Sequence, residues 1–300
     1  MIALLAPGQG AQTPGMLADW LELPGATDHI ARWSQISGLD LATLGTTATA
    51  EEITDTAVTQ PLVVATTLLA FAELARRGLP GRTVVAGHSV GEIAAYAIAG
   101  VISADDAVRL AAVRGAEMAK ACAVEPTGMS AVLGGEEDEV LARLEALELV
   151  PANRNAAGQI VAAGAISALE KLAEDPPAKA RVRQLATAGA FHTHYMASAH
   201  DGYAAAAATV TASDPTTTLL SNADGRPVTS GADAMEKLVA QLTRPVRWDL
   251  CTTTMSELGT TAIVEFPPAG TLTGIAKREL RGVATHAVKT PADLDGLTEL

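Results

Sequence analysis

Short apolar runs and segments of helical periodicity alternate along most of the chain. The apolar runs predict buried strands at Ile2–Ala6, Thr83–Ala86, Thr218–Ser221 and Thr261–Glu265. Between them, apolar residues spaced three and four apart predict helices, at 59–77, 92–99, 103–121, 233–242 and 271–281. Residues 15–50 predict irregular helices. Because short strands alternate with helices, we expect a mainly parallel sheet covered on both faces.

The middle of the chain has a different order of elements. Strand-like runs and helical segments follow one another as strand-helix-strand-strand-helix-strand, at Met129–Leu133, 136–147, 149–152, 159–163, Ile166–Ala173 and Val182–Ala186. This order is typical of a ferredoxin-like α+β unit. We therefore expect a larger, hydrolase-like α/β domain of residues 1–125 and 192–300, with a ferredoxin-like subdomain inserted at 126–191. The polar segment Asn153–Gln159 predicts a loop, in which Asn155 or Gln159 faces a cleft or simply forms a turn.

A serine flanked by glycines stands at one strand-to-helix boundary, in Gly87-His88-Ser89-Val90-Gly91. This pattern in this context is typical of a nucleophile elbow, which holds the serine out above a tight turn. The Val90 N–H at the start of the helix can then face an oxyanion on a carbonyl that Ser89 attacks. The alternative is a chance match in a chain with 26 glycines.

The helix predicted after the elbow carries a charge on its apolar side. Ser103 and Asp106 form a start that resembles a capping box, and the apolar stripe holds Ala107, Leu110, Ala111 and Met118. Arg114 lies on the same stripe. An unpaired buried charge is costly, so this guanidinium needs an anion. The spacing leaves two candidates open, an internal carboxylate or the carboxylate of a substrate gripped by the guanidinium fork.

Two further segments predict parts of a site. The first strand runs into the glycine-rich loop Pro7–Gln12, an arrangement that forms sites in α/β proteins, although an ordinary tight loop fits equally. It lacks the Lys-Ser/Thr pair of a phosphate loop. The chain also carries a candidate base at the domain junction Gly189–His194. Spacing alone does not choose among the six histidines, which are His29, His88, His192, His194, His200 and His286; His88 is expected to point away from the adjacent Ser89.

Composition narrows the class of protein. The 300 residues are 48% hydrophobic, enough for a sizeable core. Cys122 and Cys251 are far apart with no CxxC pattern, which indicates a reducing compartment rather than a disulfide framework or zinc site. No basic segment precedes Arg32, so no signal peptide is expected. The best apolar run, Pro61–Ala72, is too short for a membrane span and ends at Glu73. We expect a cytoplasmic protein.

The formal net charge of −13 argues against nucleic acid as a partner. An anionic partner would need a local basic patch. The candidates are Arg181 with Arg183, and Lys277 with Arg278 and Arg281. Solvated charges with no partner are the simpler interpretation of each residue taken singly.

A series of motifs in order resembles the malonyl-CoA:acyl-carrier-protein transacylase family and the acyltransferase domains of polyketide synthases. The resemblance spans essentially the whole chain. Its motifs are Pro7-Gly-Gln-Gly-Ala-Gln12, Thr59-Gln60-Pro61, Gly87-His-Ser-Val-Gly-Glu92, Val113-Arg114-Gly115, Asn155-x-x-Gly-Gln159, Gly189-Ala-Phe-His192, Ser221-Asn222-x-Asp224, Gln241-Leu-x-x-Pro-Val-x-Trp248 and Glu265-x-x-Pro-x-x-x-Leu-Thr-Gly274. Pro267 departs from the family, where glycine is frequent, and affects the shape of that loop.

The resemblance implies the following catalytic roles. Ser89 is the nucleophile and His192 is the general base and acid. The backbone carbonyl of Gln241 orients the second nitrogen of the histidine, so no aspartate completes a triad. The N–H groups of Gln9 and Val90 form the oxyanion hole.

The resemblance also implies a set of substrate contacts. Arg114 binds the free malonyl carboxylate, with Gln60 beside it. Phe191 fills the space that an α-methyl group would occupy and so favours malonyl over methylmalonyl. Met118 and Asn155 complete the expected substrate-binding set.

The expected activity is transfer of a malonyl group from malonyl-CoA to the phosphopantetheine thiol of an acyl carrier protein, through a malonyl-serine intermediate, for fatty-acid synthesis. The substrates are malonyl-CoA and the phosphopantetheinylated carrier protein. No metal and no permanently bound cofactor is expected, and the chain is expected to be a monomer that contacts no membrane.

Three alternatives remain open at this point. A malonyl transacylase that serves polyketide synthesis would use the same site. A serine esterase or thioesterase would need an acid between Ser89 and the histidine, for which Glu174 or Asp175 has the right order; the inserted subdomain and Arg114 argue against it. A carrier-protein docking module without catalysis would not need Ser89, His192 and Arg114 together.

Overall fold

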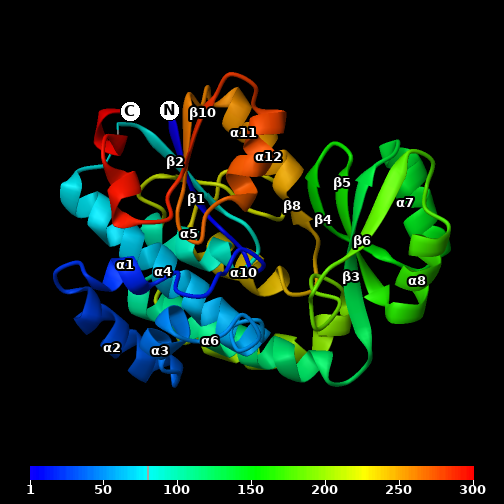
Figure 1. Ribbon diagram of the computed structural model, residues 1–300, viewed down its shortest axis with the longest axis horizontal. Helices are drawn as coiled ribbons and strands as arrows, with labels where there is room; N and C mark the ends of the chain where they lie inside the picture. The colour runs from blue at the N-terminus through cyan, green and yellow to red at the C-terminus, as the bar shows by residue number, and fades with distance from the viewer. Residues whose placement is uncertain (80) are drawn as a thin grey trace.

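The computed structural model describes residues 1–79 and 81–300, and its strands form two sheets (Figure 1). The first sheet has the order β10-β9-β1-β2-β7 and is parallel throughout. The second has the order β6-β3-β5-β4-β8 and is antiparallel except between β4 and β8. The strands are β1 (Ile2–Ala6), β2 (Thr83–Gly87), β3 (Thr127–Gly134), β4 (Val150–Ala156), β5 (Gln159–Ala165), β6 (Ala180–Gln184), β7 (Thr218–Leu219), β8 (Val246–Arg247), β9 (Ala262–Glu265) and β10 (Ala284–Ala287).

Helices connect most of these strands. They are α1 (Ala18–Leu21), α2 (Ala26–Ser37), α3 (Leu41–Thr46), α4 (Thr56–Arg77), α5 (Gly91–Ile98), α6 (Ala104–Cys122), α7 (Glu137–Ala146), α8 (Ile166–Glu174), α9 (His200–Ala207), α10 (Gly231–Ala240), α11 (Trp248–Glu257) and α12 (Thr271–Glu279). Short 3₁₀ helices lie at His194–Ala199, Pro291–Leu294 and Leu297–Glu299.

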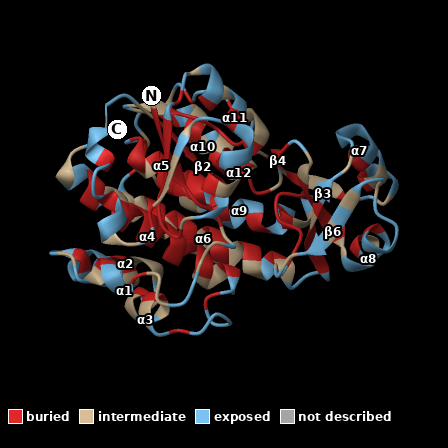
Figure 2. Ribbon diagram, turned by 45° about the horizontal axis from the view of Figure 1, so that its top comes forward, coloured by how far each residue is buried: buried red, intermediate tan, exposed pale blue. Residues whose placement is uncertain are grey.

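The parallel sheet is buried on both faces, as the alternation of strands and helices predicts. In β1, Leu4 and Ala6 pack into the cluster formed with α4, α5 and α6, whereas Ala3 and Leu5 pack into the cluster on the other face, with α11 and α12. Figure 2 shows these central strands in red, with exposed residues on the outer helices. Alternate side chains of a strand point to opposite faces, so a strand that is apolar at every position needs cover on both sides.

The second sheet forms the smaller part of the molecule, at the right of Figure 1. Its first four strands and α7 and α8 follow one another as β3-α7-β4-β5-α8-β6, the ferredoxin-like order. Val140, Leu144, Leu169 and Leu172 on the two helices pack against the sheet. The C-terminal part of the chain adds β8 beside β4, a strand that the sequence pattern missed.

Two local predictions are wrong. Helix α4 begins at Thr56 rather than Thr59, because the Asp55 carboxylate caps it by accepting the Ala57 N–H at 2.8 Å; Pro61 therefore lies inside the helix instead of in its first turn. The polar segment 153–159 is not a loop, since its residues up to 156 belong to β4, where they pair with β5 and β8.

Helix α4 is long and apolar enough to cross a membrane by length and composition alone, although the sequence predicted no such segment. The sequence-based prediction considered only the apolar run Pro61–Ala72, whereas the helix extends beyond both ends of that run. Within the protein, 78% of its most apolar window is buried. The helix packs against α5 and α6 under the parallel sheet, which accounts for its apolar composition.

Candidate active site

The serine between the glycines stands in a strained turn between β2 and α5. Ser89 has φ 55°, in the left-handed region that L residues rarely adopt. A Cβ on Gly87 would lie 2.0 Å from the Gly91 carbonyl oxygen, and one on Gly91 would lie 2.3 Å from the Ala6 oxygen. Only glycine fits at either position. The predicted nucleophile elbow is therefore present.

The side chain of Asn222 holds this turn from outside. Its Oδ1 accepts the Ser89 N–H at 2.8 Å, and its Nδ2 donates to the Gly87 carbonyl at 2.7 Å. No role was predicted for Asn222 from the sequence. Its place in the Ser221-Asn222-x-Asp224 motif is the signal that could have drawn attention to it.

The fold brings His192 to the serine hydroxyl. Nε2 of His192 lies 2.7 Å from Ser89 Oγ, and Nδ1 lies 2.9 Å from the Gln241 carbonyl oxygen. A carbonyl only accepts, so Nδ1 carries the proton and Nε2 is free to accept one from the serine. Burial, followed by the positive charge of Arg114, lowers the pKa of His192 to about 3. The imidazole is therefore neutral near pH 7, as a base must be.

The two histidines nearest in sequence to Ser89 and His192 have other partners. His88, next to the serine, pairs through Nε2 with Asn155 Oδ1 at 2.9 Å and meets the Trp248 ring edge-on. His194 stacks on Tyr195 with ring centroids 4.2 Å apart. Tertiary geometry thus selects among six histidines that sequence spacing left equal.

No carboxylate orients His192 in the part of the chain that the structure describes, because a backbone carbonyl occupies that position. Asp175, one of the acids that an esterase would require, pairs with Arg143 at 2.8 Å near the surface. Glu174 ends α8 on the outside of the small sheet. The arrangement differs from the Ser, acid, His order of an α/β hydrolase.

Two residues that line the cavity beside the serine are the candidates for an oxyanion hole. They are Gln9, in the loop after β1, and Val90, at the start of α5. Across residues 1–79 and 81–300, neither N–H donates to an acceptor of the protein. The Gln9 side chain is fixed instead, since its Oε1 accepts from Thr56 Oγ1 at 2.7 Å. The loop can approach the elbow closely because Gly8 has no Cβ. A Cβ at this position would lie 2.7 Å from the His88 carbonyl oxygen.

Arg114 is buried at the same cavity, with 1% of its surface exposed. One terminal nitrogen donates to Gln60 Oε1 and the other to Gln241 Oε1, each at 2.8 Å. Among the described residues no carboxylate lies within ion-pair distance of it, and its Nε has no partner. Burial lowers the pKa of Arg114. A buried cation held only by amide oxygens is a ready site for an anion.

The predicted site residues meet at one cavity of about 420 Å³. It is lined by Gln9, Gln60, Ser89, Val90, Arg114, Met118, Asn155, Phe191 and His192, among others. Gln241 adds its backbone carbonyl from behind the histidine. Met118 Sδ lies 3.4 Å from Gln60 Nε2. Asn155 reaches the cavity from β4 rather than from a loop. The sequence had no signal for Thr56, which links the Gln9 side chain to that of Gln60.

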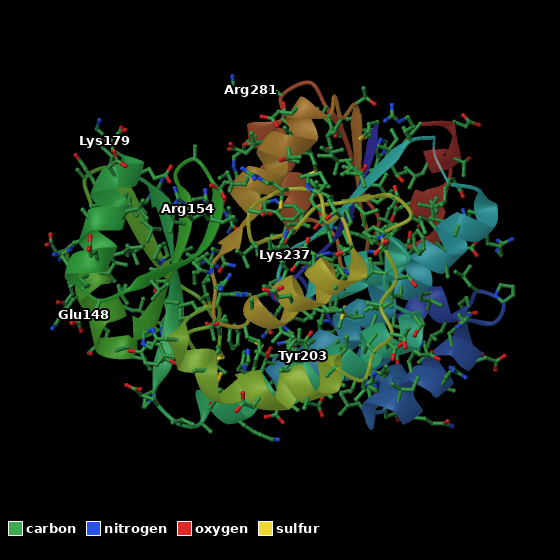
Figure 3. All side chains as sticks on the ribbon, turned by 180° about the vertical axis from the view of Figure 1, so that it is seen from behind. Glu148, Arg154, Lys179, Tyr203, Lys237 and Arg281 are labelled. Atoms are coloured by element: carbon green, nitrogen blue, oxygen red, sulfur yellow. The ribbon has the colours of Figure 1, made fainter. Side chains whose placement is uncertain are left out.

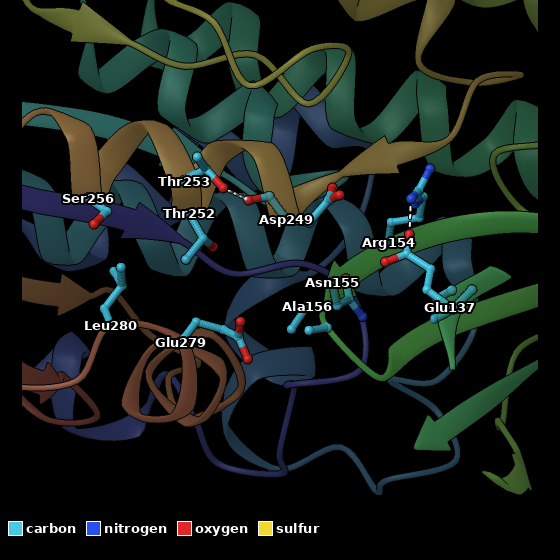
Figure 4. Close-up of a pocket in the computed structure, with 12 residues that line it drawn as sticks. Glu137, Arg154, Asn155, Ala156, Asp249, Thr252, Thr253, Ser256, Glu279 and Leu280 are labelled. Atoms are coloured by element: carbon cyan, nitrogen blue, oxygen red, sulfur yellow. Dashed lines mark hydrogen bonds and ion pairs between the residues drawn. The ribbon is translucent and has the colours of Figure 1, made fainter. Parts of the chain in front are cut away.

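A second cavity, of about 390 Å³, shares Asn155 with the first (Figure 4). Its charged groups largely pair with each other or with neighbours: Arg154 pairs with Glu137, and Asp249 pairs with Arg247 at 2.8 Å. The residues of the candidate basic patches line neither cavity, although Arg278 donates to Oε1 of Gln159, which lines the first. Arg181 and Arg183 stand exposed on the edge strand β6, and Arg281 projects at the periphery in Figure 3.

Chemically, the first cavity presents a serine that a neutral imidazole can deprotonate, and its lining includes two residues whose backbone N–H groups are candidates to stabilise an oxyanion. Such a site makes and breaks esters and thioesters, and the buried cation a short distance away suits an acyl group with a free carboxylate. The fold and the site thus define an acyl-transfer enzyme of the serine–histidine type.

Comparisons with known proteins agree with this class. The chain matches the acyl transferase domain family over residues 4–293, and it belongs to that family. It is 79% identical to the malonyl CoA-acyl carrier protein transacylase of Mycolicibacterium smegmatis over 290 residues, covering 95% of this chain and 100% of that protein.

Solved structures also match the chain over almost its whole length. A crystal structure of MCAT from Mycobacterium tuberculosis has a TM-score of 0.97 and 74% identity, covering 99% of both chains. A malonyl transacylase in complex with a type II polyketide synthase acyl carrier protein has a TM-score of 0.94 and 30% identity, again over 99% of both chains. These matches confirm the resemblance drawn from the motifs and the two-part fold.

Proposed function

We propose that this chain transfers a malonyl group from malonyl-CoA to the phosphopantetheine thiol of an acyl carrier protein, through an ester on Ser89, for fatty-acid synthesis. The observation that carries the proposal is Arg114, a buried guanidinium with amide partners only, at the cavity of Ser89 and His192. Malonyl has the two features that this cavity is built for, a thioester carbonyl at one end and a free carboxylate at the other.

In the first half-reaction, His192 Nε2 takes the proton of Ser89 Oγ as the oxygen attacks the thioester carbon. The carbonyl oxygen becomes an oxyanion, which the N–H groups of Gln9 and Val90 stabilise. When the tetrahedral intermediate collapses, the carbon–sulfur bond breaks and the imidazolium returns the proton to the CoA sulfur. The products are malonyl-Ser89 and free CoA.

The second half-reaction runs the same steps from a new thiol. The phosphopantetheine thiol of the carrier loses its proton to His192 and attacks the ester carbon. Ser89 leaves as an alkoxide and recovers the proton from the imidazolium. Because both thiols use one site in turn, the kinetics are ping-pong. Arg114 holds the malonyl carboxylate through both halves, which keeps the acyl carbon beside the nucleophile.

A carrier protein as partner is supported by the relatives, which are named acyl-carrier-protein transacylases, and by the related complex of a malonyl transacylase with its carrier. A role in polyketide synthesis is the second candidate, because that complex contains a polyketide synthase carrier. Comparing kcat/KM for a fatty-acid carrier and a polyketide carrier separates the two, since the acyl site is the same for both.

The proposal includes three further properties. The chain acts as a monomer, needs no resident metal or cofactor, and works in the cytoplasm with CoA thioesters. Light scattering on the peak that elutes from a size-exclusion column should give a mass near 30.6 kDa. Exhaustive treatment with a chelator should leave the rate of malonyl transfer unchanged. Fractionation of cells should place the chain with the cytoplasmic proteins.

The decisive experiment is intact-protein mass spectrometry after mixing with malonyl-CoA or acetyl-CoA, for the wild type and Ser89→Ala. A malonyl adduct on the wild type only, with little acetyl adduct, supports the covalent step and the carboxylate site together. Release of free malonate without an adduct would instead favour a hydrolase.

A further inference from the structure

A buried carboxyl group lies behind the cavity, and the mechanism above does not use it. Glu92 is the second residue of α5 and has 1% of its surface exposed. Both of its oxygens accept from N–H donors. Oε1 accepts the backbone N–H of Asn222 at 2.6 Å, and Oε2 accepts from Nε2 of Gln241.

The Gln241 side chain has one possible orientation as a result. Its Nε2 is surrounded by oxygens, namely Glu92 Oε2, the Ser89 carbonyl at 3.2 Å and Asn222 Oδ1 at 3.2 Å. Its Oε1 accepts from Arg114 at 2.8 Å. A reversed amide would place Oε1 against acceptors and Nε2 against an arginine donor. The oxygen must therefore face Arg114.

We propose that Glu92 is a positioning residue for recognition of the substrate carboxylate, because it fixes the Gln241 amide with its oxygen on Arg114. The inference rests on the proposed function, in which Arg114 binds the malonyl carboxylate. Glu92 does not line the cavity, and it reaches Arg114 through Gln241. The backbone carbonyl of Gln241 also orients His192, so one residue links the arginine to the base.

The role requires a carboxylate rather than an amide. Two N–H donors approach Glu92, and a carboxylate can accept from both, whereas a carboxamide has a single acceptor oxygen. In Glu92→Gln, the new NH₂ group must face either the Asn222 N–H or the Gln241 Nε2. If Gln241 turned over to relieve that clash, it would present a donor to Arg114. An NH₂ group that faces Gln241 passes the conflict to the arginine, whereas one that faces the Asn222 N–H disturbs the elbow instead.

Burial raises the pKa of Glu92 to about 7, while the Asn222 N–H, the Gln241 amide and the positive charge of Arg114 favour the ionised form. The two cavity-side groups that Glu92 influences, Arg114 and His192, are held by different atoms of Gln241. Loss of the side-chain contact therefore affects Arg114 first, since the bond to His192 uses the backbone.

The test compares two substrates in the full-length enzyme. The quantity measured is kcat/KM for malonyl-CoA and for acetyl-CoA, in the wild type, Glu92→Gln, Glu92→Asp and Arg114→Ala, with thermal unfolding of each variant. Acetyl lacks the carboxylate. We expect Glu92→Gln to lower malonyl transfer roughly 10- to 30-fold and acetyl transfer less than about 3-fold, because a bond to a charged group is disturbed. Glu92→Asp keeps two acceptor oxygens and should fall between.

A matched control is Glu73→Gln on α4, a buried carboxylate that pairs with Arg76 and Arg77 away from the cavity. It should leave the ratio of malonyl to acetyl transfer unchanged. Equal losses for both substrates in Glu92→Gln would overturn the inference and leave Glu92 a residue of the elbow's fold only. If that variant does not fold, Glu92→Asp decides, and an unchanged ratio there overturns it.

Arg114→Ala separates this inference from the proposed function. If that variant keeps the wild-type preference for malonyl, the assignment of the carboxylate site to Arg114 fails. If it loses the preference while Glu92→Gln and Glu92→Asp keep it, only the positioning role of Glu92 fails.

Discussion

The two ends of the substrate cavity are built in different ways. At the nucleophile end, most parts come from one short stretch of backbone, with a strained Ser89, glycines that allow a tight turn and the Val90 N–H before α5, and only His192 reaches it from far along the chain. At the carboxylate end, the parts are side chains from α4, α6 and the residue after α10, which are Gln60, Arg114 and Gln241. In the proposed function, the first end supplies reactivity and the second supplies selectivity. This division predicts that substitutions at the two ends differ in kind as well as in size.

The largest effect is expected at the nucleophile end. Ser89→Ala removes the atom that carries the acyl group, so transfer of malonyl and acetyl should both fall at least roughly 10,000-fold. Transfer rates measured with either CoA thioester would give the size of the decrease. The acyl-enzyme adduct should also be absent from the mass spectrum. A variant that still forms the adduct would place the nucleophile elsewhere.

The next effect sharpens the contrast between the ends. Arg114→Ala should lower kcat/KM for malonyl-CoA about 10- to 100-fold, because a bond between charged groups is lost. Acetyl-CoA should change little, since it has no carboxylate for the arginine. Equal losses with both substrates would make Arg114 a structural residue of α6.

A smaller change in selectivity is expected at Phe191, which is nearly buried beside His192. Phe191→Ser opens space next to the acyl group, so the ratio of methylmalonyl to malonyl transfer should rise about 10-fold, the scale of one methyl group in a tight pocket. Competition between the two CoA thioesters measures the ratio directly. Phe71→Ser, in the remote core against Phe266, is the control and should leave it unchanged.

The smallest effect connects the two ends through charge. A histidine ordinarily takes up its proton near pH 6.5, and burial with the Arg114 charge lowers the pKa of His192 to about 3. Acylation by acetyl-CoA should therefore persist well below pH 6. In Arg114→Ala the repelling charge is gone, so the acid limb should move to higher pH. An acid limb at the same pH in both proteins would show that the two ends are electrostatically independent.

The same pKa shift has a consequence for stability. Between about pH 3 and 6.5 the unfolded chain binds a proton at His192 that the folded protein does not. The contribution of His192 to folding is therefore present in full above pH 6.5 and is lost as the pH falls through the folded pKa. Denaturant unfolding of the wild type and His192→Gln between pH 4 and 7 should show a difference that narrows toward acid.

The parts of the site that depend on neighbouring residues were predictable from the sequence. The elbow was found because its glycines, its strand and its helix are adjacent in the chain, and backbone sterics act over a few residues. The helix start at Ser103 was also predicted, and its Oγ accepts the Asp106 N–H at 3.0 Å. The start of α4 and the extent of β4 were wrong, because a cap at Asp55 and pairing with β5 and β8 override the local pattern.

The sequence by itself determined which chemical groups this protein has and the local turn that exposes Ser89. The motifs, taken as a resemblance, also indicated the roles those groups play. Only the tertiary structure decided which groups meet. The parallel pairing of Ala6 with Gly87 brings the Gln9 loop to the elbow. The packing of α4 on α6 leaves Arg114 between amides instead of carboxylates. These contacts join residues that are tens to hundreds of positions apart in the chain. They depend on chain topology, which periodicity and spacing do not encode.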